Sequence, residues 1–148
     1  MIAIGSDHRG YKLKEEIKKY LEDENIEYKD FGTYSDERMN FPGIGKLVAK
    51  SVQDGDAEKG ILICGTGFGM AIVANKYRGI RCTPCVTENA ARYAKSHNNA
   101  NILALGAEEL SVNAAINIIR TWIATEFSGG IYEERIKIIE EIEKENMK

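Results

Sequence analysis

The stretch that decides the fold is residues 60–76, which read GILICGTGFGMAIVANK. It starts with an unbroken apolar run at residues 61–64, passes through a loop of alternating glycines and continues as an apolar helical segment. An apolar run without alternation is typical of a strand buried on both faces, as in a parallel sheet. Gly65, Gly67 and Gly69 allow the backbone to turn sharply. We therefore predict a strand, a tight loop and a helix.

The same succession recurs along the chain. Short apolar runs, each ending near glycine or a small polar residue, predict strands at residues 2–5, 26–31, 60–64, 79–86 and 101–106. Helical patterns fall between them, first on the face formed by Leu13, Ile17 and Leu21, then at residues 42–52, 70–76, 88–95, 111–127 and 131–148. Thr87 and Ser111 are expected N-caps.

Alternating strands and helices favour a parallel sheet with helices on both faces. We predict an α/β fold: a three-layer, Rossmann-like, doubly wound domain with a parallel sheet of about five strands plus a C-terminal helix. A length of 148 residues suits one domain over residues 1–148.

Composition limits the class of protein. The chain is 43% hydrophobic and carries a formal net charge of −3, which gives no general attraction to nucleic acid or to a membrane surface. Its three cysteines are not a secreted disulfide framework. The first five residues lack the charged head and long apolar core of a signal peptide. We expect a soluble, cytoplasmic protein.

Ligands of parallel α/β sheets bind at the carboxyl ends of the strands. The first predicted strand ends near Asp7 and His8, and the third ends at Cys64 and the glycine loop, so both ends open on one edge. The loop amides and the start of the next helix form a cradle for a phosphate or a reaction oxyanion. A helix start also lowers the pKa of a neighbouring thiol, although a buried structural cysteine is the alternative for Cys64.

Other interpretations of these motifs stay open. The loop also fits a strand-to-helix turn without a ligand, and a nicotinamide-dependent oxidoreductase remains an alternative, although Met70 stands where the dinucleotide motif needs its third glycine. Cys82 and Cys85 form a C-x-x-C motif. On an extended strand they face opposite sides, and no second pair completes a zinc site, so we expect both to be structural and predict no metal.

Several segments together resemble the ribose-5-phosphate isomerase type B family. They are residues 4–11 (IGSDHRGY), Leu13-Lys14, residues 64–70 (CGTGFGM), residues 74–76 (ANK), residues 79–81 (GIR) and His97-Asn98. The wider group includes galactose-6-phosphate and allose-6-phosphate isomerases. The resemblance implies an enzyme of the pentose phosphate pathway that interconverts ribose 5-phosphate and ribulose 5-phosphate through an enediolate, without metal or organic cofactor. The two hexose-phosphate isomerases and a non-catalytic sugar-phosphate-binding module are alternatives.

The resemblance also implies roles for individual residues. Cys64 would be the base that moves a proton between C1 and C2, and His97 the acid that opens the sugar ring. Asp7 would assist at the sugar hydroxyls. The Thr66 hydroxyl and the loop amides would stabilise the enediolate oxygen; these amides belong to Gly65, Thr66, Gly67, Phe68 and Gly69. The sugar or its phosphate would be held by His8, Asn98 and Arg135.

One position departs from the family pattern. Many members carry two arginines, four residues apart, that bind the phosphate; here Arg135 is present but the first position is Ile131. The loss of one charge-assisted contact costs about 1.5–3 kcal/mol of binding. Strict preference for a pentose phosphate is therefore in question, and unphosphorylated sugars become candidate substrates.

Topology predicts how the site is assembled. His97 precedes the last strand, whereas Cys64 ends the third, so the two lie at opposite ends of the sheet, about 16 Å apart for a five-residue strand. We expect a two-fold homodimer, alone or within a tetramer, whose sites combine Cys64 of one subunit with His97 of the other. Arg135 is a further candidate for crossing. The segment 131–148 fits a surface helix on its own domain or one that reaches over a partner subunit.

Overall fold

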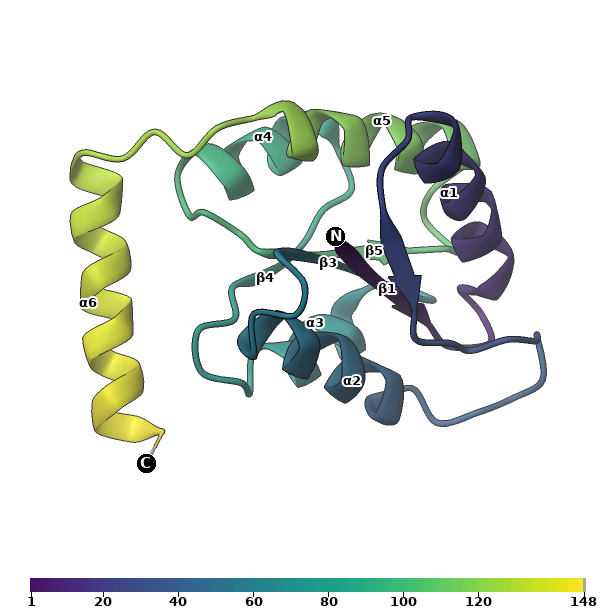
Figure 1. Cartoon of the computed structure of the whole chain (residues 1–148), viewed down its shortest axis with the longest axis horizontal. Helices are drawn as coiled ribbons and strands as arrows, with labels where there is room; N and C mark the ends of the chain where they lie inside the picture. Colours follow the sequence, from purple (N-terminus) through teal and green to yellow (C-terminus); the bar gives the residue numbers. More distant parts are fainter. Residues whose placement is uncertain (148) are drawn as a thin grey trace.

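The computed structural model describes residues 1–147, and within them all strands form one five-stranded parallel sheet (Figure 1). The strands are β1 (Ile2–Ser6), β2 (Tyr28–Asp30), β3 (Lys59–Cys64), β4 (Cys82–Pro84) and β5 (Ile102–Gly106). Their order across the sheet is β2-β1-β3-β5-β4. The predicted α/β fold is confirmed, because the three central strands are the long apolar runs of the sequence and are buried on both faces.

Helices cover both faces of the sheet. One layer contains α1 (Tyr11–Asp23), α4 (Glu88–Ser96) and α5 (Val112–Ala124), and the other contains α2 (Pro42–Gln53) and α3 (Phe68–Ala74). Each layer packs its apolar stripe against its own side of the strands and makes a separate core. The last helix, α6 (Ile131–Asn146), stands beside the sheet on the side of β4 (Figure 1).

The outer strands are shorter than predicted. The runs at residues 26–31 and 79–86 contain only three-residue strands, because β2 and β4 are edges that pair on one side. Pro84 closes β4, as expected for a residue without an amide hydrogen. The helix expected at 70–76 begins earlier, at Phe68, and the one expected at 111–127 ends at Ala124. The N-caps are confirmed: the Thr87 and Ser111 hydroxyls accept the amides of Ala90 and Ala114 at 3.0 and 3.1 Å.

A buried ion cluster ties α1 to the end of β2. The Lys14 side chain is fully buried, and its Nζ lies 2.6 and 2.7 Å from the two carboxylate oxygens of Asp30. Lys18 donates to the same carboxylate at 2.9 Å, and the Gly32 amide at 2.8 Å. Burial alone would raise the pKa of the Asp30 carboxyl, but these hydrogen bonds outweigh it and hold the pKa below its usual value. The cluster thereby fixes the start of the segment that leads from β2 to α2.

We expect Asp30→Asn to destabilise the protein by about 3 kcal/mol at pH 7, because it leaves the buried Lys14 ammonium without its main partner. The carboxyl has a depressed pKa in the folded state, so its contribution is complete above the unfolded-state pKa of about 4 and is lost as the pH falls through the folded-state pKa. Urea unfolding at pH 7 and at pH 3 measures this difference.

Asp54→Asn is the matched control, because Asp54 pairs with Lys50 at 3.1 Å on the exposed surface of α2. Its effect should stay within about 1 kcal/mol at both pH values. Equal losses for the two variants at pH 7, or a loss for Asp30→Asn that does not shrink at pH 3, would show that the buried cluster does not stabilise the fold in this way.

Candidate active site

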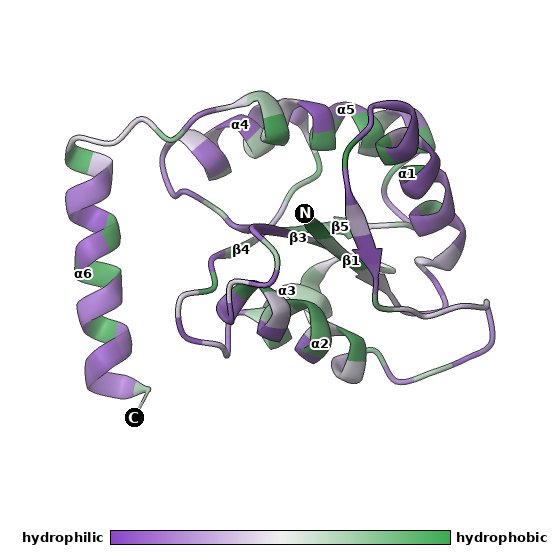
Figure 2. Ribbon diagram, in the orientation of Figure 1, coloured by the Kyte–Doolittle hydropathy of each residue, from purple (hydrophilic) through white to green (hydrophobic). Residues whose placement is uncertain are grey.

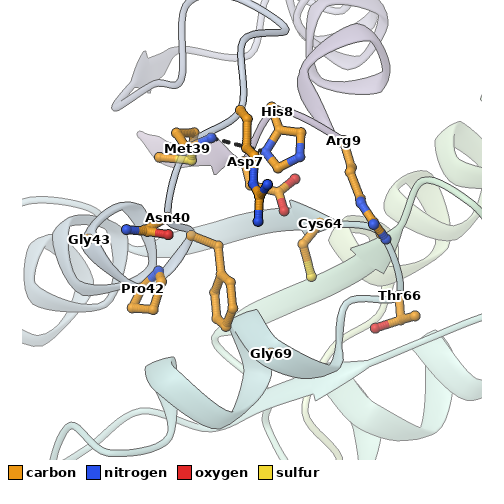
Figure 3. Close-up of a pocket in the computed structure, with 13 residues that line it drawn as sticks. Asp7, His8, Arg9, Met39, Asn40, Pro42, Gly43, Cys64, Thr66 and Gly69 are labelled. Carbon is orange, nitrogen blue, oxygen red and sulfur yellow. Dashed lines mark hydrogen bonds between the residues drawn. The ribbon is translucent and has the colours of Figure 1, made fainter.

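A cavity of about 930 Å³ opens at the carboxyl edge of the sheet. Three segments line it: the turn after β1, the loop after β3, and the polar segment between β2 and α2 (Figure 3). The lining residues are Asp7, His8, Arg9, Arg38, Met39, Asn40, Phe41, Pro42, Gly43, Cys64, Gly65, Thr66 and Gly69. The structure thus brings together six of the residues singled out from the sequence: Asp7, His8, Cys64, Gly65, Thr66 and Gly69.

Cys64 is the last residue of β3, and its thiol lies in the cavity although the residue is only 6% exposed. The Gly67 amide donates a hydrogen bond to Sγ at 3.2 Å. This contact holds the sulfur beside the first turn of the glycine loop, at the surface of the cavity. Gly67 has a φ of +85°, a conformation that a residue with a side chain adopts only with strain, so glycine at this position allows the contact.

The loop uses some of its own donors. In addition to the Gly67 contact with sulfur, the Phe68 amide donates to the Thr66 hydroxyl at 3.2 Å. Such a turn is common where Ser or Thr stands two residues before an amide. The expectation that all amides of residues 65–69 point at one ligand therefore needs revision: two of them are satisfied within the loop, and the Phe68 ring is exposed rather than turned into the cavity.

The loop is held by the end of β5. The Ala107 and Glu108 amides donate to the carbonyl oxygens of Cys64 and Gly65 at 2.8 and 3.0 Å. Gly106, the residue before these two, approaches so closely that a Cβ on it would lie 2.7 Å from the Thr66 carbonyl oxygen. A backbone atom cannot move aside as a flexible side chain can, so glycine here keeps the loop in place.

Asp7 and His8 are held by backbone amides. Asp7 is buried, and its Oδ1 accepts the Gly10 amide at 3.0 Å at the start of α1. The Nδ1 atom of His8 accepts the Met39 amide at 3.3 Å, drawn as a dashed line in Figure 3. A neutral His8 ring therefore carries its proton on Nε2, which makes Nε2 the donor.

Sequence reasoning missed the segment at residues 34–41, which supplies Arg38, Met39, Asn40 and Phe41 to the cavity. Its polar composition indicates only a loop. The available signal was topological, since it follows β2 and so starts at the same carboxyl edge as the other loops. The Phe41 ring packs on the glycine loop: a Cβ on Gly69 would lie 2.7 Å from its Cζ atom.

Arg9 was also missed. Its guanidinium lies 2.9 Å from the Glu108 carboxylate, in an ion pair between the turn after β1 and the turn after β5. The pair passes beside Gly65, where a Cβ would be 3.2 Å from the Arg9 Nη1 atom and 3.3 Å from the Glu108 carboxyl carbon. The negative charge of Glu108 therefore balances the positive charge of Arg9 at this side of the cavity.

His97, Asn98 and Arg135 lie away from the cavity lining. In the β3–β5 ladder Cys64 pairs with Gly106 at the carboxyl ends and Gly60 pairs with Ile102 at the amino ends. His97 ends α4, just before the amino end of β5, so four strand residues, about 13 Å, separate its level from that of Cys64. The topology expected from the sequence is therefore present within one chain.

His97 has aromatic neighbours that the sequence did not indicate. Its ring stacks on Tyr132 with centroids 4.2 Å apart and an interplanar angle of 7°, and Tyr93 lies on it at 4.8 Å. The Arg135 guanidinium lies 5.6 Å from the centre of the Tyr132 ring. A second group of polar and aromatic side chains therefore forms where α4 meets α6.

α6 combines two kinds of surface. It contacts its own chain through the buried Ile136 and through Glu143, whose carboxylate accepts the Gly79 amide at 2.8 Å. Figure 2 shows hydrophobic segments among hydrophilic ones along this helix. Its exposed apolar residues, which are 39–60% exposed, are Ile131, Ile138, Ile139 and Ile142. The interpretation as a surface helix and the interpretation as a helix that contacts a partner subunit both retain support. One face of α6 packs on its own chain, and another face exposes apolar side chains.

The structure also bears on a metal site, on a membrane-spanning helix and on the C-x-x-C cysteines. Among residues 1–147, no three His, Cys, Asp or Glu side chains are grouped as a metal site would need, and none of the helices has the length and apolarity to span a bilayer. Cys82 packs in the core under α2 and α3, whereas Cys85 packs in the opposite core. The two thiols face opposite sides of the sheet, as predicted.

Comparison with known proteins connects this geometry to a family. The model of the ribose/galactose isomerase family matches residues 2–139. A ribose-5-P isomerase B of Listeria innocua is 41% identical over 145 residues, 98% of each chain. The structure of a Clostridium thermocellum ribose-5-phosphate isomerase B is 46% identical, with a TM-score of 0.96 over 97% of each chain. A Mycoplasma genitalium ribose-5-phosphate isomerase B with bound ribulose-5-phosphate is 37% identical, with a TM-score of 0.93 over 98% of this chain and 97% of that one.

The three thiols should differ in reactivity. Burial raises the pKa of Cys82 to about 12 and that of Cys85 to about 11, so both remain protonated at pH 8 and lie within the core. Cys64 faces the cavity with a donor on its sulfur. We expect iodoacetamide at pH 8 to add one carbamidomethyl group, on Cys64, as measured by peptide mass spectrometry.

Cys64→Ala should resist this labelling in the native state, and all the thiols of the wild type should react in denaturant. Modification of Cys82 or Cys85 ahead of Cys64 would contradict this assignment.

Proposed function

Because the chain belongs to the ribose/galactose isomerase family, we propose that it interconverts ribose 5-phosphate and ribulose 5-phosphate. The observation that carries the proposal is the Cys64 thiol, which accepts the Gly67 amide at 3.2 Å in a cavity shared with Asp7 and His8. Aldose–ketose isomerisation needs a base beside a carbon next to a carbonyl and donors for the oxyanion. The family assignment argues against the oxidoreductase alternative.

In the proposed reaction the Cys64 thiolate removes the C2 proton of the open-chain aldose and returns it to C1. The electron pair of the C2–H bond forms the enediolate double bond, and the negative charge passes to O1 next to the glycine loop. The Thr66 hydroxyl and the loop amides other than those of Gly67 and Phe68 stabilise that charge. The O2 hydroxyl proton moves to O1, and Asp7, fixed at Oδ1 by the Gly10 amide, assists at the two sugar oxygens.

Ring opening needs a separate acid, and we assign it to His97 of a partner subunit. Within one chain His97 is about 13 Å from the level of Cys64, at the other end of the sheet. A two-fold dimer brings the two ends together twice. The exposed isoleucines of α6, together with Phe68 and Ile72 on one face of α3, which are 58% and 61% exposed, provide apolar surface for that contact.

Proton exchange tests the reaction directly. In heavy water, incubation with ribose 5-phosphate should yield ribulose 5-phosphate and introduce deuterium next to the carbonyl, as followed by NMR. Cys64→Ala should lower kcat by at least about 100-fold, the usual contribution of a general base. Cys82→Ala removes an equally buried thiol that is not part of the cavity lining and should keep wild-type turnover.

The same assay ranks the substrates. We expect the highest kcat/KM for ribose 5-phosphate, followed by allose 6-phosphate and galactose 6-phosphate, with free allose and psicose lowest. A hexose phosphate that exceeds ribose 5-phosphate would replace the proposed substrate. Binding of ribose 5-phosphate without turnover or exchange would instead identify a non-catalytic binding module.

Mixed dimers test the shared site. Cys64→Ala and His97→Ala homodimers should each be almost inactive. After the two are unfolded and refolded together in equal amounts, half of the dimers are heterodimers, and each contains one intact site, so activity should return to about one quarter of wild type. Proven heterodimers without this recovery would place both residues in one subunit's site.

A further inference from the structure

The positive charges around the cavity are not equivalent. Two guanidinium groups line it, those of Arg9 and Arg38. Arg9 is already engaged, because its Nη1 lies 2.9 Å from the Glu108 carboxylate. Arg38 is exposed, and within residues 1–147 its side chain takes part in no ion pair. The lining as described contains no lysine, so Arg38 is its one cation without a carboxylate partner.

The backbone around Arg38 is anchored on the functional side. The next residue, Met39, donates its amide to His8 Nδ1 at 3.3 Å, and Phe41 packs its ring on Gly69. Figure 3 shows Met39 and Asn40 across the cavity from Thr66. The segment at residues 34–41 therefore forms the wall opposite the glycine loop. Arg38 directly precedes Met39, whose amide hydrogen bond orients the His8 imidazole.

The sugar phosphate has two ends with different requirements. Its C1 and C2 must lie at Cys64, while the phosphate on C5 is a dianion that needs a cation and hydrogen-bond donors some carbon atoms further along. The glycine loop serves the first end. The opposite wall carries Arg38, and a guanidinium binds phosphate in bidentate fashion. His8 lines the same cavity and supplies an Nε2–H donor.

We propose that Arg38 is a phosphate-binding residue of this site, acting together with His8. This inference rests on the proposed function, because it assigns one end of the same substrate. It also accounts for Ile131: a chain without a cation at that position retains a phosphate-binding guanidinium from the segment at residues 34–41. Arg38 thus selects phosphorylated sugars and takes no part in the proton transfer at C1 and C2.

Arg38→Ala should raise KM for ribose 5-phosphate by about tenfold or more, the cost of one charge-assisted hydrogen-bonded contact, and change kcat much less. Inorganic phosphate should inhibit the wild type competitively, and its inhibition constant should rise by a similar factor in the variant. Arg38→Lys keeps the positive charge but cannot bind phosphate in bidentate fashion. Its KM and its phosphate inhibition constant should lie between those of the wild type and Arg38→Ala. Turnover of free allose or psicose, where measurable, should be unaffected.

Arg120→Ala is the matched control, because Arg120 is exposed on α5 and contacts Asn117 and Tyr20 away from the cavity. All assays are run at one ionic strength, since exposed charges are screened by salt. The inference is overturned if KM and phosphate inhibition of Arg38→Ala match those of Arg120→Ala. It is also overturned if kcat falls as much as kcat/KM, which would assign Arg38 to the chemical step.

Calorimetric titration with ribose 5-phosphate and with inorganic phosphate separates this inference from the proposed function. If the wild type binds ribose 5-phosphate but does not isomerise it, the proposed function fails, whereas a tenfold weaker Kd in Arg38→Ala still supports the phosphate-binding role. If the wild type isomerises ribose 5-phosphate and both proteins bind it equally, the proposed function stands and the role of Arg38 is wrong.

Discussion

The close approach of two backbones at the end of the sheet is the constraint on which the site depends. β3 and β5 are parallel neighbours in which Cys64 pairs with Gly106, and the loop after β3 folds back over the end of β5. A Cβ on Gly106 would lie 2.7 Å from the carbonyl oxygen of Thr66. Because nothing but hydrogen occupies that space, the loop can be fixed by the Ala107 and Glu108 amides. The position of the Gly67 donor on the Cys64 sulfur follows from this anchoring.

A parallel sheet also separates functional groups by direction. Each strand delivers residues that follow it to one edge and residues that precede it to the other. Cys64 follows β3 and His97 precedes β5, so no rotamer change within the chain brings them together. The enzyme function proposed above requires both, and a two-fold axis is the simplest arrangement that supplies them. In the proposed dimer, assembly and chemistry are therefore coupled through topology rather than through any single interface contact.

The sequence was sufficient wherever the structure depends on periodicity or on local chemistry. Continuous apolar runs identified the central strands, and hydroxyl side chains identified two helix starts at Thr87 and Ser111. It was insufficient where residues distant along the chain meet. The Met39 amide reaches His8 across 31 positions and Arg9 reaches Glu108 across 99, and a polar segment shows neither partner in its own pattern. The expectation for the loop amides needs revision for a different reason. It counted every amide as free for a ligand, whereas those of Gly67 and Phe68 form hydrogen bonds within the loop.

α6 combines a contact with His97 and an exposed apolar surface. Its first turn carries Tyr132, which stacks on His97 at 4.2 Å, and its buried Ile136 fixes the helix on its own chain. The isoleucines at positions 138, 139 and 142 face away and stay exposed. In the proposed dimer, a second copy buries that surface and so stabilises a helix that makes few contacts with its own chain. The same helix contacts the His97 ring through Tyr132. A partner that covers α6 therefore also orders the acid that, in the proposed dimer, belongs to the partner's own site.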